Sequence, residues 1–395
     1  MKIIFNTSNF PKNKDDPTTP FIFHLARAIS KNQQVDILAP ASNDSLKDET
    51  WDNVAIHRFR YFPVSAFQLL FSTGGAIGSL RKNRIKYLLV PFFIVSQTLK
   101  LFKLSLKNKY SLIHSHWIIP QGASGLLVSK LLRIPHVVTI HGGDIFFFNN
   151  ILGRSIKKVI ARNADAIVCN SLITKNKLLE ITQIDSSKIK IIPAPVELER
   201  FRSISKKKKK ANTFLFVGRL VEEKGIFTLI KSFSLIVQEL PNSHLKIVGD
   251  GPDKSKLVEL VKILNIPNVT FTGWIQHEDI PFIFSDAWTY VGVSRTSKEG
   301  WQEAMGISYV EALASNCNVI CNKTAGFLSI LSEHDYSSIF TINNPDDINE
   351  LAKKMRASTT SNSQFPIDSL RHFSSNNTAK EYIKIYKDLK KYYDK

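Results

Sequence analysis

The sequence is poor in cysteine, and this limits its redox and metal chemistry. Cys169, Cys317 and Cys321 stand in apolar surroundings among 395 residues. They have neither the paired spacing of a disulfide framework nor a neighbouring cysteine or histidine pair for zinc. We therefore expect reduced thiols in the core of a cytoplasmic protein, and no metal site.

Long uninterrupted apolar runs are also lacking. The amino-terminal segment MKIIFNTSNF turns polar after four residues, so we expect no signal-peptide core there. The longest apolar stretch begins at Tyr87 and is interrupted by Pro91, Gln97, Lys100 and Lys103. It is predicted to be a poor membrane span.

Acidic residues are scarce relative to basic ones. The chain has 53 lysines and arginines against 34 aspartates and glutamates, a formal net charge of +19. This excess favours nucleic acid, acidic lipid headgroups or phosphorylated substrates as partners. No RNA-binding motif of aromatic and basic residues, zinc-finger spacing or helix-turn-helix signature is present. We therefore expect no nucleic-acid partner, and a basic nucleic-acid-binding protein remains the alternative from another functional class.

The length and the 43% hydrophobic content are sufficient for two packed cores. In both halves, short β-rich runs alternate with helical patterns, which predicts parallel sheets covered by helices. The fold class is therefore α/β, with two doubly wound, Rossmann-like domains. The predicted strands are KIIF, VDILAP, VAIHRF, SLIHSH, HVVTIHG and AIVCNS in the first half, and TFLFVGR, HLKIVGDG, VTFTGW, AWTYVGVS, NVICN and SIFTI in the second.

Prolines and charge mark the domain boundaries. We predict an amino-terminal domain over 1–192, a hinge and linker over 193–210, a carboxyl-terminal domain over 211–375 and a terminal helix over 376–395. The lysine run 206–210 is predicted to be a solvated tether, with a nuclear or nucleic-acid signal as the alternative. The terminal helix is predicted to pack back on the first domain, because four apolar residues share one face: Tyr382, Ile385, Tyr386 and Leu389.

Open parallel sheets bind ligands beyond the carboxyl ends of their strands, so a site is expected in a cleft between the two domains. After the strand TFLFV, Gly218, Arg219 and Lys224 precede a predicted helix. Two cations and a helix amino terminus suit a diphosphate. The alternative is that both are ordinary surface charges.

A second candidate region is EGWQEAMGISYVEALAS. Gly306 stands where a helix beginning near Ile307 would present free backbone amides to an anion. Glu303 and Glu311 are separated by roughly 12 Å at helical rise, which is too far for the carboxylate pair of a glycoside hydrolase. They fit two anchors for a long polar ligand. The alternative is a solvated Glu311 and a helix-dipole partner at Glu303.

These motifs resemble the retaining nucleotide-sugar glycosyltransferases of the GT-B fold, specifically glycosyltransferase family 4, over nearly the whole chain. The resemblance implies that Glu303 contacts the donor hexose and Glu311 the ribose, while Arg219 and Lys224 hold the diphosphate. VTIHGGD resembles the family's His-Gly-x-Asp turn and places His141 near the reacting sugar and acceptor, with Asp144 in the same turn. Softer matches are His116 in SLIHSHW and Gly249 in VGDGP.

Some positions depart from the family pattern. The usual Glu-Gly-x-Gly reads Glu303-Ala304-Met305-Gly306, and the usual Asn-Gly after the hinge proline reads Ala194-Pro195. A Gly-Gly-x-x-Glu near the donor base survives only as Gly326, so base recognition is not predicted. The loop from Lys12 lacks the family's glycine pair.

The implied enzyme is a retaining hexosyltransferase acting on a lipid-linked or cell-surface polysaccharide acceptor. The runner-up is a soluble transferase that extends a free sugar or a glycogen-like acceptor. A nucleotide sugar serves as co-substrate, without a cofactor or a required metal ion. The segment from Arg81 interleaves basic and large apolar side chains, which fits either a surface lying on anionic lipid or a core helix with a basic rim. We expect a cytoplasmic protein in peripheral contact with the inner face of the cell membrane.

Overall fold

The computed structural model describes residues 1–13, 16, 20–42, 48–63, 68, 70, 80, 83–205, 209, 212–297, 300–331, 337–361 and 365–393. Of the predicted lysine tether, the residues other than Lys209 lie outside this set, as does part of the loop from Lys12. The chain forms two compact units, one of Met1–Pro195 with Ser375–Lys395 and the other of Val196–Ser374. We call them the amino-terminal and the carboxyl-terminal unit.

The amino-terminal unit is built on a sheet whose described strands follow the order β3-β4-β2-β1-β5-β6-β7-β8. All neighbouring strands are parallel except β3 and β4, which form an antiparallel edge. The strands are β1 Lys2–Asn6, β2 Gln34–Pro40, β3 Asp48–Trp51, β4 Val54–Phe59, β5 Leu112–His116, β6 His136–Ile140, β7 Ala166–Cys169 and β8 Ile189–Ile191.

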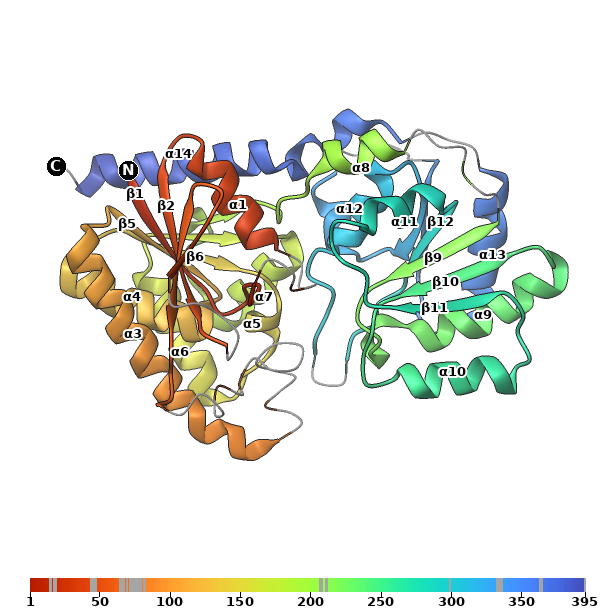
Figure 1. The fold of residues 1–395 in the computed structure, drawn as a ribbon, viewed down its shortest axis with the longest axis horizontal. Helices are drawn as coiled ribbons and strands as arrows, with labels where there is room; N and C mark the ends of the chain where they lie inside the picture. The colour runs from red at the N-terminus through yellow and green to blue at the C-terminus, as the bar shows by residue number, and fades with distance from the viewer. Residues whose placement is uncertain are drawn as a thin grey trace. The chain divides into compact units, whose positions relative to one another are not determined.

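Helices cover both faces of this sheet (Figure 1). Successive strand residues point to opposite faces, so Ile3 and Phe5 pack in one core with α1 and the terminal helix α14, while Ile4 packs in another with α3 and α4. The helices are α1 Phe21–Ser30, η2 Arg84–Leu88, α3 Leu89–Asn108, η3 Ile118–Gly122, α4 Ala123–Leu132, α5 Gly143–Phe146, α6 Ile151–Asn163, α7 Leu172–Thr182, η4 Ser186–Lys188 and α14 Ser375–Tyr393.

The carboxyl-terminal unit has a wholly parallel sheet among its described strands, in the order β11-β10-β9-β12-β13-β14. One face is covered by α9, α10 and α13, while α8 packs with α11 and α12. The strands are β9 Thr213–Val217, β10 His244–Val248, β11 Val269–Gly273, β12 Thr289–Gly292, β13 Asn318–Asn322 and β14 Ile339–Ile342. The helices are α8 Leu198–Ile204, η5 Glu222–Lys224, α9 Ile226–Glu239, α10 Lys254–Ile263, α11 Ile280–Asp286, α12 Ile307–Ala314, η6 Gly326–Ser329, α13 Ile348–Thr360 and η7 Ile367–Phe373.

The predicted fold class is confirmed, since both units are doubly wound α/β layers. The twelve predicted strands all form, at the positions of β1, β2, β4 to β7 and β9 to β14. Two further strands, β3 and β8, were not predicted, because each is short and lies at a sheet edge. Cys169, Cys317 and Cys321 are buried free thiols, as expected.

The terminal helix α14 joins the core of the amino-terminal unit. Tyr382 and Tyr386 are buried against the strands, and Ile385 and Leu389 pack at the edge of the same core. The apolar face seen in the sequence is therefore the face that packs.

The predicted linker 193–210 differs from the structure. Part of it is the helix α8, Leu198–Ile204, which belongs to the carboxyl-terminal unit. Leu198 and Phe201 are buried, and the Phe201 ring lies edge-on to Phe284 at 5.9 Å between centroids. Lys209 is anchored too, because its ammonium donates to the carbonyls of Phe284 and Ala287. Apolar packing thus makes Leu198–Ile204 part of the carboxyl-terminal unit, although the two prolines before it suggested a hinge.

Candidate functional site

The predicted donor cations follow the carboxyl end of β9. Gly218 and Arg219 come directly after the strand, and Lys224 ends the short helix η5 before α9 begins. A hydrogen bond from the Leu220 amide to the Asp250 carbonyl, at 2.9 Å, joins this loop to the loop that follows β10. This is the sheet edge at which the sequence placed the site.

Lys224 and Glu303 are brought together as an ion pair. Both side chains are about one-fifth exposed. The Ser294 hydroxyl donates to the same Glu303 oxygen at 3.3 Å, and the Lys224 ammonium lies 5.3 Å from the centre of the Trp301 ring. Sequence reasoning missed Ser294 and Trp301. Ser294 could have been found, because it follows β12 at the carboxyl edge of the sheet.

Gly306 begins the helix α12, as predicted. It has a φ of 78°, in the left-handed region that favours glycine. A Cβ here would lie 2.3 Å from the Tyr309 ring and 3.5 Å from Cγ of Glu303. The start of α12 is therefore next to the Lys224–Glu303 pair.

Glu311 lies inside α12 and is 5% exposed. Burial raises the pKa of this carboxyl to about 8, and nearby Arg200 acts in the opposite direction. A raised pKa of this size marks a carboxyl with little solvation, of the kind often found at functional sites. The alternative interpretation of Glu311, as a solvated helix residue, is therefore wrong.

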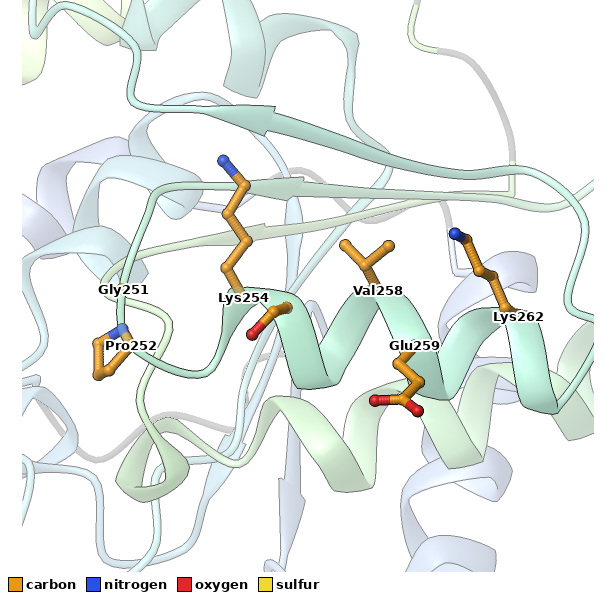
Figure 2. Close-up of a pocket in the computed structure, with 7 residues that line it drawn as sticks. Gly251, Pro252, Lys254, Val258, Glu259 and Lys262 are labelled. Carbon is orange, nitrogen blue, oxygen red and sulfur yellow. The ribbon is translucent and has the colours of Figure 1, made fainter.

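Gly249 brings the loops after β9 and β10 into close contact. Its φ is 129°, and a Cβ at this position would lie 1.9 Å from the Gly218 carbonyl oxygen. The same loop leads to an open pocket along α10, where Lys254 and Lys262 project from one side of the helix (Figure 2). The described residues that line the pocket include none of the predicted donor residues: Gly251, Pro252, Lys254, Ser255, Val258, Glu259 and Lys262.

In the amino-terminal unit, His116 and His141 meet at the carboxyl ends of β5 and β6. Nδ1 of His116 lies 3.1 Å from Nε2 of His141, and the rings are stacked at 17°. Burial lowers the pKa of His141 to about 3 and lowers that of His116 well below its ordinary value. Both imidazoles are therefore neutral at neutral pH, and one ring nitrogen donates to the other.

Asp144 holds the His141 turn in place. Its carboxylate accepts from the amides of Ile118 at 2.8 Å, His141 at 3.1 Å and Gly142 at 3.0 Å. The side chain is 4% exposed, and burial raises its pKa against the opposing effect of these amides. Asp144 thus joins the turn after β6 to the segment after β5. This positions His141.

A chain of buried contacts continues from His116 to the terminal helix. The His114 ring lies 4.1 Å from that of His116, and its nitrogens are 2.7 Å from the hydroxyls of Thr139 and Tyr386. Tyr382 also contacts Thr139, at 3.1 Å between hydroxyl oxygens. The sequence showed the apolar face of α14, but no local pattern indicated that its tyrosine hydroxyls would reach these groups.

The two sets of residues are suited to different tasks. In the carboxyl-terminal unit, a lysine, a nearby arginine and a helix amino terminus can hold a negatively charged group, and the two glutamates can accept hydrogen bonds from hydroxyls. In the amino-terminal unit, neutral histidines can exchange hydrogen bonds with a polar group without charge.

Comparison with known proteins identifies the class to which this architecture belongs. The family description "Glycosyl transferases group 1" matches residues 198–377, and "Glycosyltransferase Family 4" matches residues 20–200. The chain belongs to the group 1, family 4 glycosyltransferases of the GT-B fold.

Individual relatives are distant. The chain is similar to an uncharacterized glycosyltransferase of Methanocaldococcus jannaschii, with 28% identity over 78% of this chain and 76% of that protein. It is 26% identical to the UDP-Gal:alpha-D-GlcNAc-diphosphoundecaprenol alpha-1,3-galactosyltransferase of Escherichia coli, over 77% of this chain and 87% of the relative. Two further relatives are matched over 56% and 60% of their own lengths.

Among solved structures, the sucrose-phosphate synthase of Thermosynechococcus elongatus superposes with a TM-score of 0.75. The superposition covers 98% of each chain at 19% sequence identity. At this identity the likeness concerns the fold.

Proposed function

We propose that this glycosyltransferase transfers a hexose, with retention of anomeric configuration, from a nucleotide diphosphate sugar to a lipid-linked or cell-surface polysaccharide acceptor. The observation that carries the proposal is the Lys224–Glu303 ion pair beside the first turn of α12. A cation, a carboxylate and a helix amino terminus are thereby concentrated where a sugar diphosphate needs them.

The proposed donor site stabilises the leaving group. Breaking the bond between the anomeric carbon and the diphosphate oxygen builds negative charge on that oxygen, which Lys224, Arg219 and the α12 amides offset. These groups reduce the need for a metal ion to carry the same charge. Glu303 binds hydroxyls of the hexose, and Glu311 binds the ribose.

The acceptor reacts on the face that the diphosphate leaves. Its hydroxyl oxygen forms the new bond to the anomeric carbon, and its proton passes to an oxygen of the departing diphosphate. His141 orients the reacting sugar and the acceptor, with His116 beside it and Asp144 holding the turn. No protein nucleophile is part of this scheme.

The relatives bear on the choice of acceptor. The named substrate of the Escherichia coli relative is linked to diphosphoundecaprenol, which favours a lipid-linked acceptor and work at the inner face of the cell membrane. The second candidate is a soluble acceptor such as a free sugar, with which the fold, shared with a sucrose-phosphate synthase, is compatible.

Two measurements test the proposal. A donor that binds only the folded protein raises its melting temperature, so we expect one nucleoside diphosphate and its sugar to raise it among UDP, GDP, ADP and their hexose conjugates. Transfer assays with that donor then compare undecaprenyl-diphosphate sugars with free sugars and glycogen. No shift with any donor contradicts the proposed donor site, whereas transfer only to soluble sugars favours the second candidate.

A further inference from the structure

The helix α3 has a second apolar side that the fold leaves uncovered. Its sheet-facing side is buried through Phe93, Leu101 and Leu104. The opposite side carries a stripe of apolar residues spaced three or four positions apart. Phe102, which is half-buried, belongs to this stripe. The other members are 53–70% exposed: Leu88, Phe92, Val95, Leu99 and Leu106. A surface helix of a soluble domain normally has polar residues on that side.

The neighbouring helices extend this apolar surface. α3 packs against α4, and α4 packs against α6 (Figure 1). Both neighbours bury the side that faces the sheet and expose large apolar side chains on the other: Leu127 and Leu131 on α4, and Ile151, Leu152, Ile156 and Val159 on α6. We call the exposed sides of α3, α4 and α6 the three-helix face. An apolar surface shared by three helices indicates a binding surface.

The charge around the three-helix face has one sign. Residues 53–164 contain sixteen lysines and arginines and one acidic residue, Asp144, whose side chain is buried in the His141 turn. Lys103 and Lys107 flank the α3 stripe, and Lys130 and Arg154 stand on the exposed sides of α4 and α6. The surface therefore combines apolar side chains with cations, without an exposed acid among its described residues.

This combination fits a lipid surface better than the alternatives. A second copy of the chain docked through the same face would bring like charges together. By length and composition, the helix Ile85–Asn108 could cross a membrane. Its inner side is part of the sheet core, however, and buried Gln97 accepts from Ser124 of α4 at 3.3 Å. Crossing would require this core to open. The expected interruption at Pro91 does not break the helix, because Pro91 lies in its first turn.

We propose that the three-helix face docks flat on a bilayer that contains anionic lipids, inserting the apolar stripe while the lysines and arginines contact the headgroups. The docked surface adjoins the acceptor-side residues, because Lys157 of α6 donates to the Ile145 carbonyl and the Asn149 side chain, in the segment that follows His141. Membrane docking itself does not depend on the identity of the acceptor.

Vesicle binding of the 395-residue chain tests this assignment without donor or acceptor. We expect binding to vesicles of phosphatidylcholine and phosphatidylglycerol at about 2:1, weakened by salt, and little binding to phosphatidylcholine alone. The double variant F92S/L99S should reduce the partition coefficient at least about tenfold. K103E/K107E should reduce it by about fivefold or more for each lysine.

Matched controls come from the carboxyl-terminal unit. I263S/F282S removes two apolar side chains of similar exposure, and K231E/K353E reverses two exposed lysines; both should bind vesicles as the unchanged protein does. Donor-induced melting shifts check that every variant is folded and test the proposed function separately. Three outcomes overturn the assignment: no binding to anionic vesicles, equal loss in the controls, or a lipid-free dimer that F92S/L99S dissociates in light scattering.

Discussion

Lys224 is held by neighbours of different chemistry before any donor arrives. The Glu303 carboxylate pairs with its ammonium, and the Trp301 ring lies below it. Such contacts restrict a flexible side chain, so less conformational entropy is lost when a diphosphate takes its place beside the ammonium. We infer that the ion pair positions Lys224 in advance and that Glu303 becomes available to the sugar when the donor binds.

Replacing Lys224 tests its role in leaving-group stabilisation. K224A should lower kcat about 10²- to 10³-fold, the scale of removing one electrostatic stabiliser from an active site. Steady-state kinetics with the donor found in the melting screen measure this. K231A, which removes an exposed lysine of α9, is the matched control and should leave kcat unchanged. Near-normal turnover of K224A would contradict the assignment.

The burial of Glu311 should lower the free energy of unfolding of the unliganded protein at neutral pH. Its pKa is raised from 4.5 to about 8 by burial, so the stabilising contribution of the protonated form is complete below pH 4.5 and is lost as the pH rises through 8. At pH 7.5, three units above the ordinary pKa of 4.5, the penalty is of the order of 4 kcal/mol.

The variant E311Q removes this penalty, because an amide does not ionise. We expect its melting temperature without donor to exceed that of the unchanged protein by a few degrees at pH 7.5 and to match it near pH 4.5. Donor affinity should fall, since a carboxylate accepts hydroxyl hydrogen bonds more strongly than an amide. Scanning calorimetry at both pH values measures the melting temperatures. An equal difference between E311Q and the unchanged protein at pH 4.5 and 7.5 would show that ionisation of Glu311 is not the cause.

At the scale of elements, α12 depends on the backbone conformation of one residue. Gly306 adopts the left-handed conformation at the start of α12, beside Glu303, and Tyr309 of the same turn donates to the Gly292 carbonyl at 2.6 Å. The position of the helix start is therefore determined by a glycine and a buried tyrosine rather than by a side-chain cap.

The chain provides a matched pair of glycines for a test of α12. Gly306 and Gly300 have φ values of 78° and 82°, but a Cβ at Gly306 meets the Tyr309 ring at 2.3 Å, while a Cβ at Gly300 meets no atom of the described residues within 4 Å. Both G306A and G300A carry a backbone strain of roughly 1 kcal/mol. G306A alone should displace the first turn of α12 and weaken donor binding at least about tenfold, as measured by calorimetric titration. Equal losses in both variants would mean that backbone strain, not the clash, is responsible.

At the scale of the whole molecule, the two units should respond differently to acid. Four histidines of the amino-terminal unit are buried with lowered pKa values: His114, His116, His136 and His141. A lowered histidine pKa gives stability that is complete above the ordinary value of 6.5 and is lost as the pH falls toward the folded value. In the carboxyl-terminal unit the lowered pKa of His277 destabilises the fold as the pH falls, while protonation of Glu311 stabilises it. The two effects oppose each other.

Amide hydrogen exchange at pH 7.5 and 5.0, corrected for the intrinsic rate, checks this expectation. Protection of β5 and β6 should fall at pH 5.0, while that of β9 and β10 should change little. Asp144 and His57, whose pKa values are raised, act in the opposite direction in the amino-terminal unit, but four imidazoles outweigh them. A uniform loss across both sheets would contradict the prediction.

Sequence patterns were sufficient for the layers of the fold and for the start of one helix, α12. Runs of β-branched and aromatic residues predicted twelve strands, and the position of Gly306 before an apolar helix predicted the start of α12. These features depend on local backbone preference and side-chain periodicity, which a sequence displays directly.

Tertiary structure decided which groups meet and which remain uncovered. The pairing of Lys224 with Glu303 joins residues 79 positions apart, and the tyrosines of α14 reach His114 across most of the chain. From the sequence, the helix that begins at Leu89 could be either a core element or a lipid-binding surface. The structure shows a buried side and an exposed apolar side on the same helix. Periodicity shows that a residue is apolar and which helix face it shares, but only the packed neighbours determine whether that face is covered.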